Sequence, residues 1–191
     1  MKGSRPTTIS AASLALIALA AGIAFPTTLR RISLDTLIQS SDYIVYGRVA
    51  AIQSSWDPGT SAIWTHTTIL ILDSPKGETG NTIGVTEPGG IVNGRGELYP
   101  GAPRFTTGQE VLLFLYRAPG ERIRVTGVLQ GLYRVEYDPK TGRRMARPAF
   151  PRTEAVFEEG RQGASAARAA EGETEDLSRL LYTIRQKVAV R

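Results

Sequence analysis

The 191-residue chain contains no cysteine and a single histidine, His66. Without cysteine it can form neither a disulfide framework nor a thiolate metal site. A transition-metal site would then depend on carboxylates, and none cluster at ligand spacing. A Ser-His-Asp arrangement would have to use His66, which lies among threonines in a predicted strand, so we expect a structural role for it. The sequence therefore predicts no catalytic residues, no metal and no cofactor.

Long apolar runs and phosphate-binding motifs are also scarce. The longest uncharged apolar run, residues 11–24, is shorter than the roughly 20 residues that a bilayer-spanning helix needs, and no second long run follows. Gly94-Arg95-Gly96 lacks the third glycine of a dinucleotide fingerprint, and no Gly-Lys-Ser/Thr triplet exists. Arginines are scattered singly among acids rather than gathered with aromatics, so we expect no nucleic-acid partner.

What the chain does have is the layout of a secretory signal peptide in residues 1–24. A basic head precedes the apolar run, which ends in Gly-Ile-Ala before a predicted cut after Ala24. The cut removes two positive charges and lowers the formal net charge from +5 to about +3. The sequence therefore predicts an exported protein, periplasmic or extracellular, without a membrane span after cleavage. An uncleaved N-terminal anchor is the alternative, because the basic pair Arg30-Arg31 follows the run.

Residues 25–152 are expected to form one β-rich domain. A short helix begins at Ser33, which can cap it. The β-branched and aromatic content predicts strands over residues 42–53, 63–72, 82–87, 111–116, 122–127 and 130–137, the last two as a pair. Gly47 predicts a bulge in the first strand, and Asp57, Asp73 and Asp138 are expected in turns. This pattern predicts a mainly β fold, a small antiparallel OB-like barrel with a short N-terminal helix and a C-terminal amphipathic helix. An open sandwich is the alternative.

The last part of the chain divides into two predicted segments. Residues 153–173 are rich in alanine, glycine, glutamate and arginine, which predicts a flexible linker. Residues 174–191 predict an amphipathic helix, with one apolar stripe made of Leu177, Leu180, Leu181, Ile184 and Val188. We expect the stripe to pack on the β domain. Docking to a partner, or a structural role at the cell surface, is the alternative.

The candidate binding region is the glycine- and proline-rich stretch from Pro88 to Gly108, which is expected to form a long loop or a pair of irregular hairpins. Loops longer than about 12 to 15 residues are usually functional or disordered. Its exposed candidates for ligand contact are Arg95, Tyr99, Arg104 and Phe105. A purely structural loop is the alternative. The topology could also bring Glu87, Glu97 and Glu110 together as hydrolase carboxylates, although their spacing does not support it.

Six motifs stand out along the chain: residues 41–49 (SDYIVYGRV), 56–58 (WDP), 65–72 (THTTILIL) followed by 76–77 (KG), 87–90 (EPGG), 100–105 (PGAPRF) and 108–115 (GQEVLLFL). Together they resemble those of an uncharacterised group of secreted bacterial β-rich proteins. The resemblance covers residues 34–137 and implies export and a single β-rich domain. It implies no activity.

Three of the same segments, Asp42–Val49, Lys76-Gly77 and Gly108–Leu115, bear a distant likeness to the netrin-like, OB-type domain of tissue inhibitors of metalloproteinases. The likeness implies the barrel. Those inhibitors chelate the target's metal through an N-terminal cysteine, which this chain lacks, so their inhibitory residues do not carry over. We therefore expect an exported, non-enzymatic binding module for a protein or an envelope polymer. The alternatives are a protease-inhibitor-like or protease-accessory domain and, less favoured, a hydrolase with a carboxylate pair.

Overall fold

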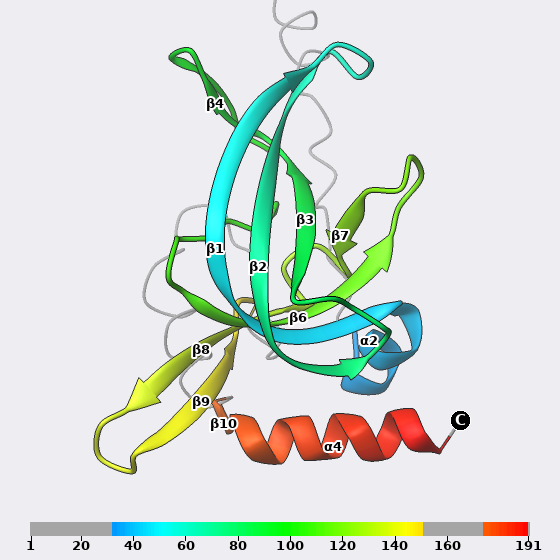
Figure 1. Ribbon diagram of the computed structural model, residues 1–191, viewed down its shortest axis with the longest axis vertical. Coiled ribbons are helices and arrows are strands. Elements are labelled where there is room, and N and C mark those ends of the chain that lie inside the picture. Colours follow the sequence, from blue (N-terminus) through cyan, green and yellow to red (C-terminus); the bar gives the residue numbers. More distant parts are fainter. Residues whose placement is uncertain (1–31, 151–173, 191) are drawn as a thin grey trace, which may run out of the picture. The chain divides into compact units, whose positions relative to one another are not determined.

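The computed structural model of the protein describes residues 32–150 and 174–190 (Figure 1). In chain order the elements are α2 (Leu34–Ser40), β1 (Tyr43–Asp57), β2 (Ala62–Lys76), β3 (Thr82–Pro88), β4 (Gly90–Val92), β5 (Arg95–Glu97), β6 (Glu110–Arg117), β7 (Ile123–Val125), β8 (Leu132–Asp138), β9 (Arg143–Pro148), β10 (Glu175–Asp176) and α4 (Leu177–Ala189). The predicted signal peptide, residues 1–24, and the predicted linker, residues 153–173, lie outside the described residues.

Most of the strands belong to one antiparallel sheet. Its order is β10-β9-β8-β6-β1-β2-β3, with β7 also paired to β6, while β4 and β5 form a separate hairpin. The predicted mainly β, antiparallel fold is therefore confirmed. Among the described strands the hydrogen-bonded path ends at β10 and at β3, so the sheet is not closed into a continuous ladder.

β6 is the central strand that its apolar sequence predicts, and both of its edges are paired. β1 occupies one edge, and β8 and β7 follow one another along the other. The expected pairing of β7 with β8 is therefore wrong. The turn between them folds onto β6 instead, because the Phe114 amide donates to the Gly131 carbonyl and the Thr126 amide donates to the Phe114 carbonyl. A Cβ at Gly131 would collide with the Thr126 carbonyl, so glycine is needed for this close approach.

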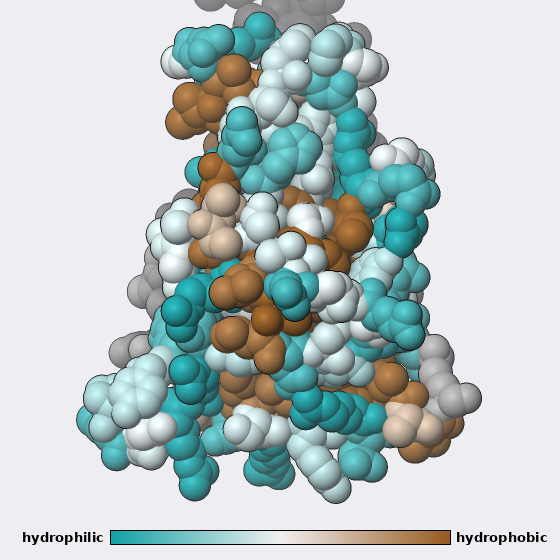
Figure 2. All heavy atoms as spheres, viewed as in Figure 1, coloured by the Kyte–Doolittle hydropathy of each residue, from teal (hydrophilic) through white to brown (hydrophobic). Residues whose placement is uncertain are grey.

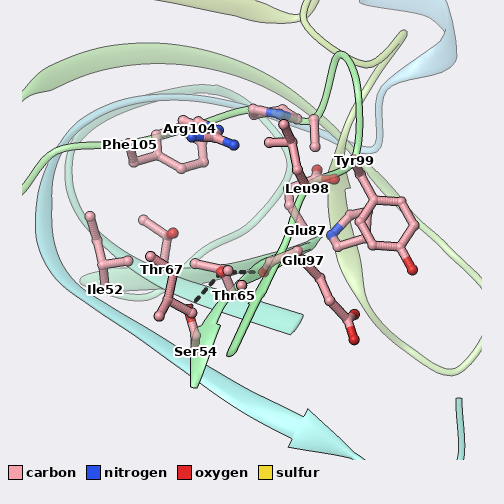
Figure 3. A pocket seen from close by; sticks show the side chains of 17 residues that line it. Ile52, Ser54, Thr65, Thr67, Glu87, Glu97, Leu98, Tyr99, Arg104 and Phe105 are labelled. Atoms are coloured by element: carbon pink, nitrogen blue, oxygen red, sulfur yellow. Dashed lines mark hydrogen bonds between the residues drawn. The ribbon is translucent and has the colours of Figure 1, made fainter. Parts of the chain in front are cut away.

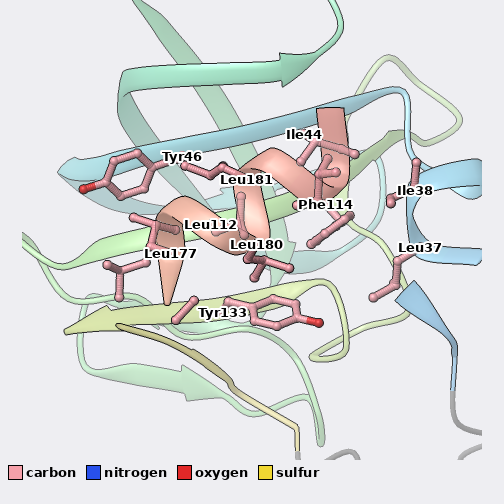
Figure 4. Close-up of a cluster of buried hydrophobic side chains, with 13 residues drawn as sticks. Leu37, Ile38, Ile44, Tyr46, Leu112, Phe114, Tyr133, Leu177, Leu180 and Leu181 are labelled. Carbon is pink, nitrogen blue, oxygen red and sulfur yellow. The ribbon is translucent and has the colours of Figure 1, made fainter. Parts of the chain in front are cut away.

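Alternate side chains of β1, β6 and β8 form two buried clusters on opposite faces of the sheet. The helix-side cluster comprises Leu37, Ile38, Ile44, Tyr46, Leu112, Phe114, Tyr133, Val135, Ala146, Leu177, Leu180, Leu181 and Ile184. The cavity-side cluster comprises Val45, Val49, Ile69, Ile83, Val85, Val111, Leu113, Leu115, Val125 and Leu132. Figure 4 shows the leucines of α4 within the helix-side cluster, with Leu180 towards Phe114 and Tyr133.

α4 packs on the sheet through the predicted apolar stripe. Asp176 caps the helix, because its carboxylate accepts a hydrogen bond from the Arg179 amide. Leu177, Leu180, Leu181 and Ile184 are buried. The expectation that the stripe packs on the β domain is confirmed, and the helix begins at Leu177 rather than at Thr174. No helix within residues 32–150 and 174–190 is long and apolar enough to cross a membrane.

β1 and β2 form the longest strand pair. Register shifts beside Gly47 confirm the predicted bulge, and a Cβ there would collide with the Leu70 carbonyl. β2 continues through Pro75 to Lys76, beyond its predicted end. Asp73 therefore lies within β2 and not in a turn, and its carboxylate pairs with Arg185 of α4. Asp57 and Asp138 do accept hydrogen bonds from the amides of their own turns, as expected.

Candidate functional site

The long stretch after β3 begins with a tight hairpin made by β4 and β5. Its turn residues, Asn93 and Gly94, have φ angles of 50° and 77°. Positive φ at both positions defines the turn type that Asn-Gly favours between strands. That dipeptide is a strong hairpin signal in the sequence, and one hairpin of the expected loop or pair of hairpins is present. The hairpin begins against β1 and β2, because a Cβ at Gly90 would collide with the hydroxyls of Ser54 and Thr65.

A cavity of about 590 Å³ lies between this stretch and the sheet (Figure 3). Its volume falls in the range of roughly 300 to 1,000 Å³ that small-molecule sites occupy. The sheet contributes Ile52, Ser54, Thr65, Thr67 and Glu87 to the lining. Residues 88–91, 96–99 and 102–105 supply the rest. Thr67 and Glu87 share sheet faces with Ile69 and Val85, so the cavity continues the face that carries the cavity-side cluster.

The structure divides the four residues singled out in the sequence. Tyr99, Arg104 and Phe105 line the cavity, and Phe105 also packs against the cavity-side cluster. Arg95 is not among the lining residues. Its guanidinium lies 5.3 Å from the centre of the Trp56 ring and 3.5 Å from the Glu97 carboxylate. Arg95 is therefore held on the outside of the hairpin by a cation–π contact and an ion pair.

Exposed apolar side chains surround the cavity. Ile91 is 73% exposed, Leu98 69% and Tyr99 42%, and Ile52 of β1 is also exposed. In Figure 2, hydrophobic side chains gather over the β4 end of the molecule and again over the middle of the visible face. Single exposed apolar residues are ordinary, whereas several around one concavity are typical of binding sites. The sequence signal that could have revealed Ile91 and Leu98 is their large apolar side chains inside a glycine-rich loop.

Several polar groups of the cavity wall bind one another or the adjoining backbone. The hydroxyls of Ser54 and Thr65 lie 2.9 Å apart, and Thr65 donates to the Gly89 carbonyl at 2.6 Å. The Glu97 carboxylate accepts from the Ile63 amide at 2.8 Å. These groups therefore fix the loop on β1 and β2.

Glu87 is a buried carboxylate at the end of β3, 4% exposed. One of its oxygens accepts from the Val125 amide at 2.6 Å and the other from the Arg124 guanidinium at 3.0 Å. Burial raises the pKa of Glu87, and these hydrogen bonds and the Arg124 charge only partly offset that rise. The side chain therefore joins β3 to β7 at the place where the sheet has no backbone ladder.

Glu110 lies away from the cavity, so the three carboxylates are not brought together. Its carboxylate accepts from the Tyr46 hydroxyl at 2.5 Å, from Arg48 at 2.8 Å and from Arg144 at 2.9 Å. Burial alone would raise its pKa, but these three donors outweigh burial and lower the pKa to about 2. Burial and the neighbouring carboxylate raise the pKa of Tyr46 to about 12. Glu110 is thus an ionised member of a surface network.

The His66 side chain lies between hydroxyl groups of the two neighbouring strands. Its ring nitrogens lie 3.2 Å from the Ser55 hydroxyl and 3.1 Å from the Thr86 hydroxyl. Within the described part of the chain, no three His, Cys, Asp or Glu side chains are grouped so that they could hold a metal ion.

Comparison of the chain with protein-family models finds no match, and comparison with curated proteins finds none either. The likenesses drawn from the sequence motifs therefore stay predictions.

Proposed function

We propose that the protein is an exported, non-enzymatic binding module that takes its ligand in the cavity between residues 88–105 and β1–β3. The observation that carries the proposal is the set of exposed apolar side chains, Ile91, Leu98 and Tyr99, around one concavity. Water surrounds these side chains in the free protein, and a ligand that covers them gains their burial. The ligand belongs to a protein or to an envelope polymer.

Export to the periplasm or the extracellular space is part of the same proposal. It is supported by the basic head, the apolar run and the small residues before Phe25. The cysteine-free composition needs no oxidative folding in that compartment.

The finer architecture that we propose is an OB-like barrel completed by side chains. β3 and β7 lack a backbone ladder, but Glu87 of β3 accepts from the Val125 amide and from Arg124 of β7. These contacts support the barrel because they connect the two strands that a closed barrel would pair.

Site-specific photocrosslinking in native cells tests the binding proposal. A photoreactive phenylalanine at position 99 lies at the cavity, and the same residue at position 137 is the matched control, since Tyr137 is also an exposed tyrosine but lies on β8. We expect position 99 to give one saturable adduct that a second substitution, Leu98→Ser, abolishes. Equal labelling from both positions, or no adduct from position 99, would contradict the proposal.

A hydrolase is the second candidate, because Glu87 and Glu97 line the same cavity and burial raises the pKa of Glu87. A carboxyl group with a raised pKa can act as a general acid. Both carboxylates, however, already bind partners of their own, which favours binding over turnover. Loss of turnover of a model glycoside or ester in Glu87→Gln, with folding retained, would favour the hydrolase.

A further inference from the structure

We propose that the part of the protein or envelope polymer that enters this cavity is amphiphilic, an apolar chain that carries a carboxylate, with Arg104 as the residue that binds the carboxylate. The inference rests on the proposed function, since it names the ligand class of the same site.

Among the described residues that line the cavity, Arg104 alone is basic. It is exposed, and it has no ion pair or hydrogen bond to any described residue. Other arginines differ from it, because Arg95, Arg122 and Arg124 pair with Glu97, Asp57 and Glu87. In Figure 3, Arg104 and Phe105 lie on one side of the cavity, across from Ile52 and Thr67. The site therefore offers an unneutralised guanidinium beside an apolar space.

The carboxylates of the wall do not compete for this cation. Glu97 is directed to the Ile63 amide and Arg95, and Glu87 to the Val125 amide and Arg124. An anionic ligand is therefore matched to Arg104 rather than repelled by uncompensated acids. A guanidinium can bind a carboxylate through two parallel hydrogen bonds. This geometry favours a carboxylate over an anionic group that accepts only one hydrogen bond.

The remainder of the cavity suits an apolar chain. The hydroxyls of Ser54 and Thr65 bond to each other and to the Gly89 carbonyl. Besides Arg104, the lining offers a ligand the hydroxyls of Thr67 and Tyr99 and, as its larger part, the apolar side chains of Ile52, Ile91, Leu98 and Phe105 with the Tyr99 ring. A sugar or a strongly polar peptide would leave most of its own hydroxyls or amides unpaired against these apolar groups, whereas an acyl chain would not.

Isothermal titration calorimetry with three probes tests the inference on the purified protein. Decanoate carries the chain and the carboxylate, decyltrimethylammonium the same chain with the opposite charge, and butanoate the carboxylate with a short chain. We expect decanoate to bind at least about tenfold more tightly than either of the others. Arg104→Glu should lower the affinity for decanoate at least about tenfold and raise the affinity for decyltrimethylammonium.

Two variants and a folding measurement keep the test decisive. Arg179→Glu is the matched charge reversal, because Arg179 is exposed on α4, which packs on the opposite face of the sheet; its decanoate affinity should equal that of the wild type. Arg104→Gln repeats the loss of charge without reversing it, and thermal unfolding monitors the fold of each variant. The ligand class would be overturned if decanoate did not bind. It would also be overturned if the folded Arg104→Glu and Arg104→Gln variants bound decanoate as tightly as the wild type does. A saturable adduct at position 99 would in that case still support the binding module itself.

Discussion

At the scale of single residues, Glu87 and Glu110 show how one side-chain type acquires opposite properties within one fold. Burial dominates at Glu87 and raises its pKa, whereas at Glu110 the donors Tyr46, Arg48 and Arg144 outweigh burial and lower the pKa. Each carboxylate connects strands that are distant in sequence. Their contributions to stability therefore differ in pH dependence and in the cost of removal.

Glu110→Gln is expected to reduce the acid sensitivity of the fold. A pKa of about 2 in the folded protein against an ordinary value of 4.5 means that ionised Glu110 stabilises the fold above pH 4.5. This contribution is lost as the pH falls from 4.5 towards 2. The variant should lose about 1 to 2 kcal/mol of unfolding free energy at neutral pH, since solvent screens the half-exposed arginines, and the difference should shrink by pH 2.5. Urea unfolding at pH 7 and pH 2.5 measures this, and an unchanged difference at both pH values would contradict it.

Glu87→Ala is expected to cost about 2 to 4 kcal/mol, because it leaves the buried Val125 amide and the Arg124 guanidinium without their acceptor. Glu136→Ala is the matched control, since its carboxylate is exposed and lies 3.7 Å from Arg147, and it should change stability by less than about 0.5 kcal/mol. Urea unfolding gives both values. Faster exchange of the Val125 amide in Glu87→Ala would locate the effect at β7, and an equal cost in both variants would refute this role.

Residue-scale prediction from sequence succeeded where local chemistry decides and failed where tertiary contacts decide. The Ser33 cap and the turn bonds of Asp57 and Asp138 depend on neighbours in the chain, and each is confirmed. Arg95 and Asp73 depend on distant partners, Trp56 and Arg185, and their placements differ from expectation.

At the scale of elements, α4 is part of the core and not a separate docking arm. Its stripe supplies Leu177, Leu180, Leu181 and Ile184 to the helix-side cluster, beside Phe114 and Tyr133 of the sheet. A deletion of residues 174–191 would expose this cluster to water. The alternative in which the apolar stripe of the helix docks to a partner is therefore not supported by the packing.

Leu180→Ala is expected to destabilise the protein by about 2 to 5 kcal/mol, because Leu180 is fully buried and its truncation leaves a cavity under α4. Tyr182→Ala is the control, because Tyr182 lies on the exposed side of the same helix. It should change the unfolding free energy by less than about 0.5 kcal/mol. Chemical denaturation of the two variants measures the difference. Similar values for both would mean that the helix contributes little to the fold.

Prediction of elements followed the strength of their periodic patterns. β1, β2, β3, β6 and α4 carry clear apolar patterns and lie near their expected positions. β9 was missed because its sequence, Arg143–Pro148, is rich in arginine and lacks β-branched residues. The predicted pairing of β7 with β8 was wrong because both strands pair with the same edge of β6 instead. The sequences of β7 and β8 do not show which third strand each will pair with.

At the scale of the whole molecule, the two faces of the sheet are covered differently. α2 and α4 cover one face through the helix-side cluster, while residues 88–105 lie over part of the other and border the cavity. The composition of one loop singled out four candidate residues, and three of them line that cavity. The cavity itself could not be predicted, because it depends on β1, β2 and β3 meeting the loop.

The export proposal makes a whole-molecule prediction. N-terminal sequencing of the protein recovered from native cells should begin at Phe25, since Gly22 and Ala24 provide the small residues that signal peptidase recognises. An intact Met1 in the membrane fraction would support the anchor alternative instead.

The separation of the two faces also makes the protein a candidate scaffold for engineered recognition. Ile91, Leu98 and Tyr99 border the cavity, yet none of them belongs to either buried cluster. Randomising these three positions would vary the proposed binding surface while the residues that hold the fold together stay constant. Directed selection could therefore give this surface new binding properties without first having to restabilise the fold.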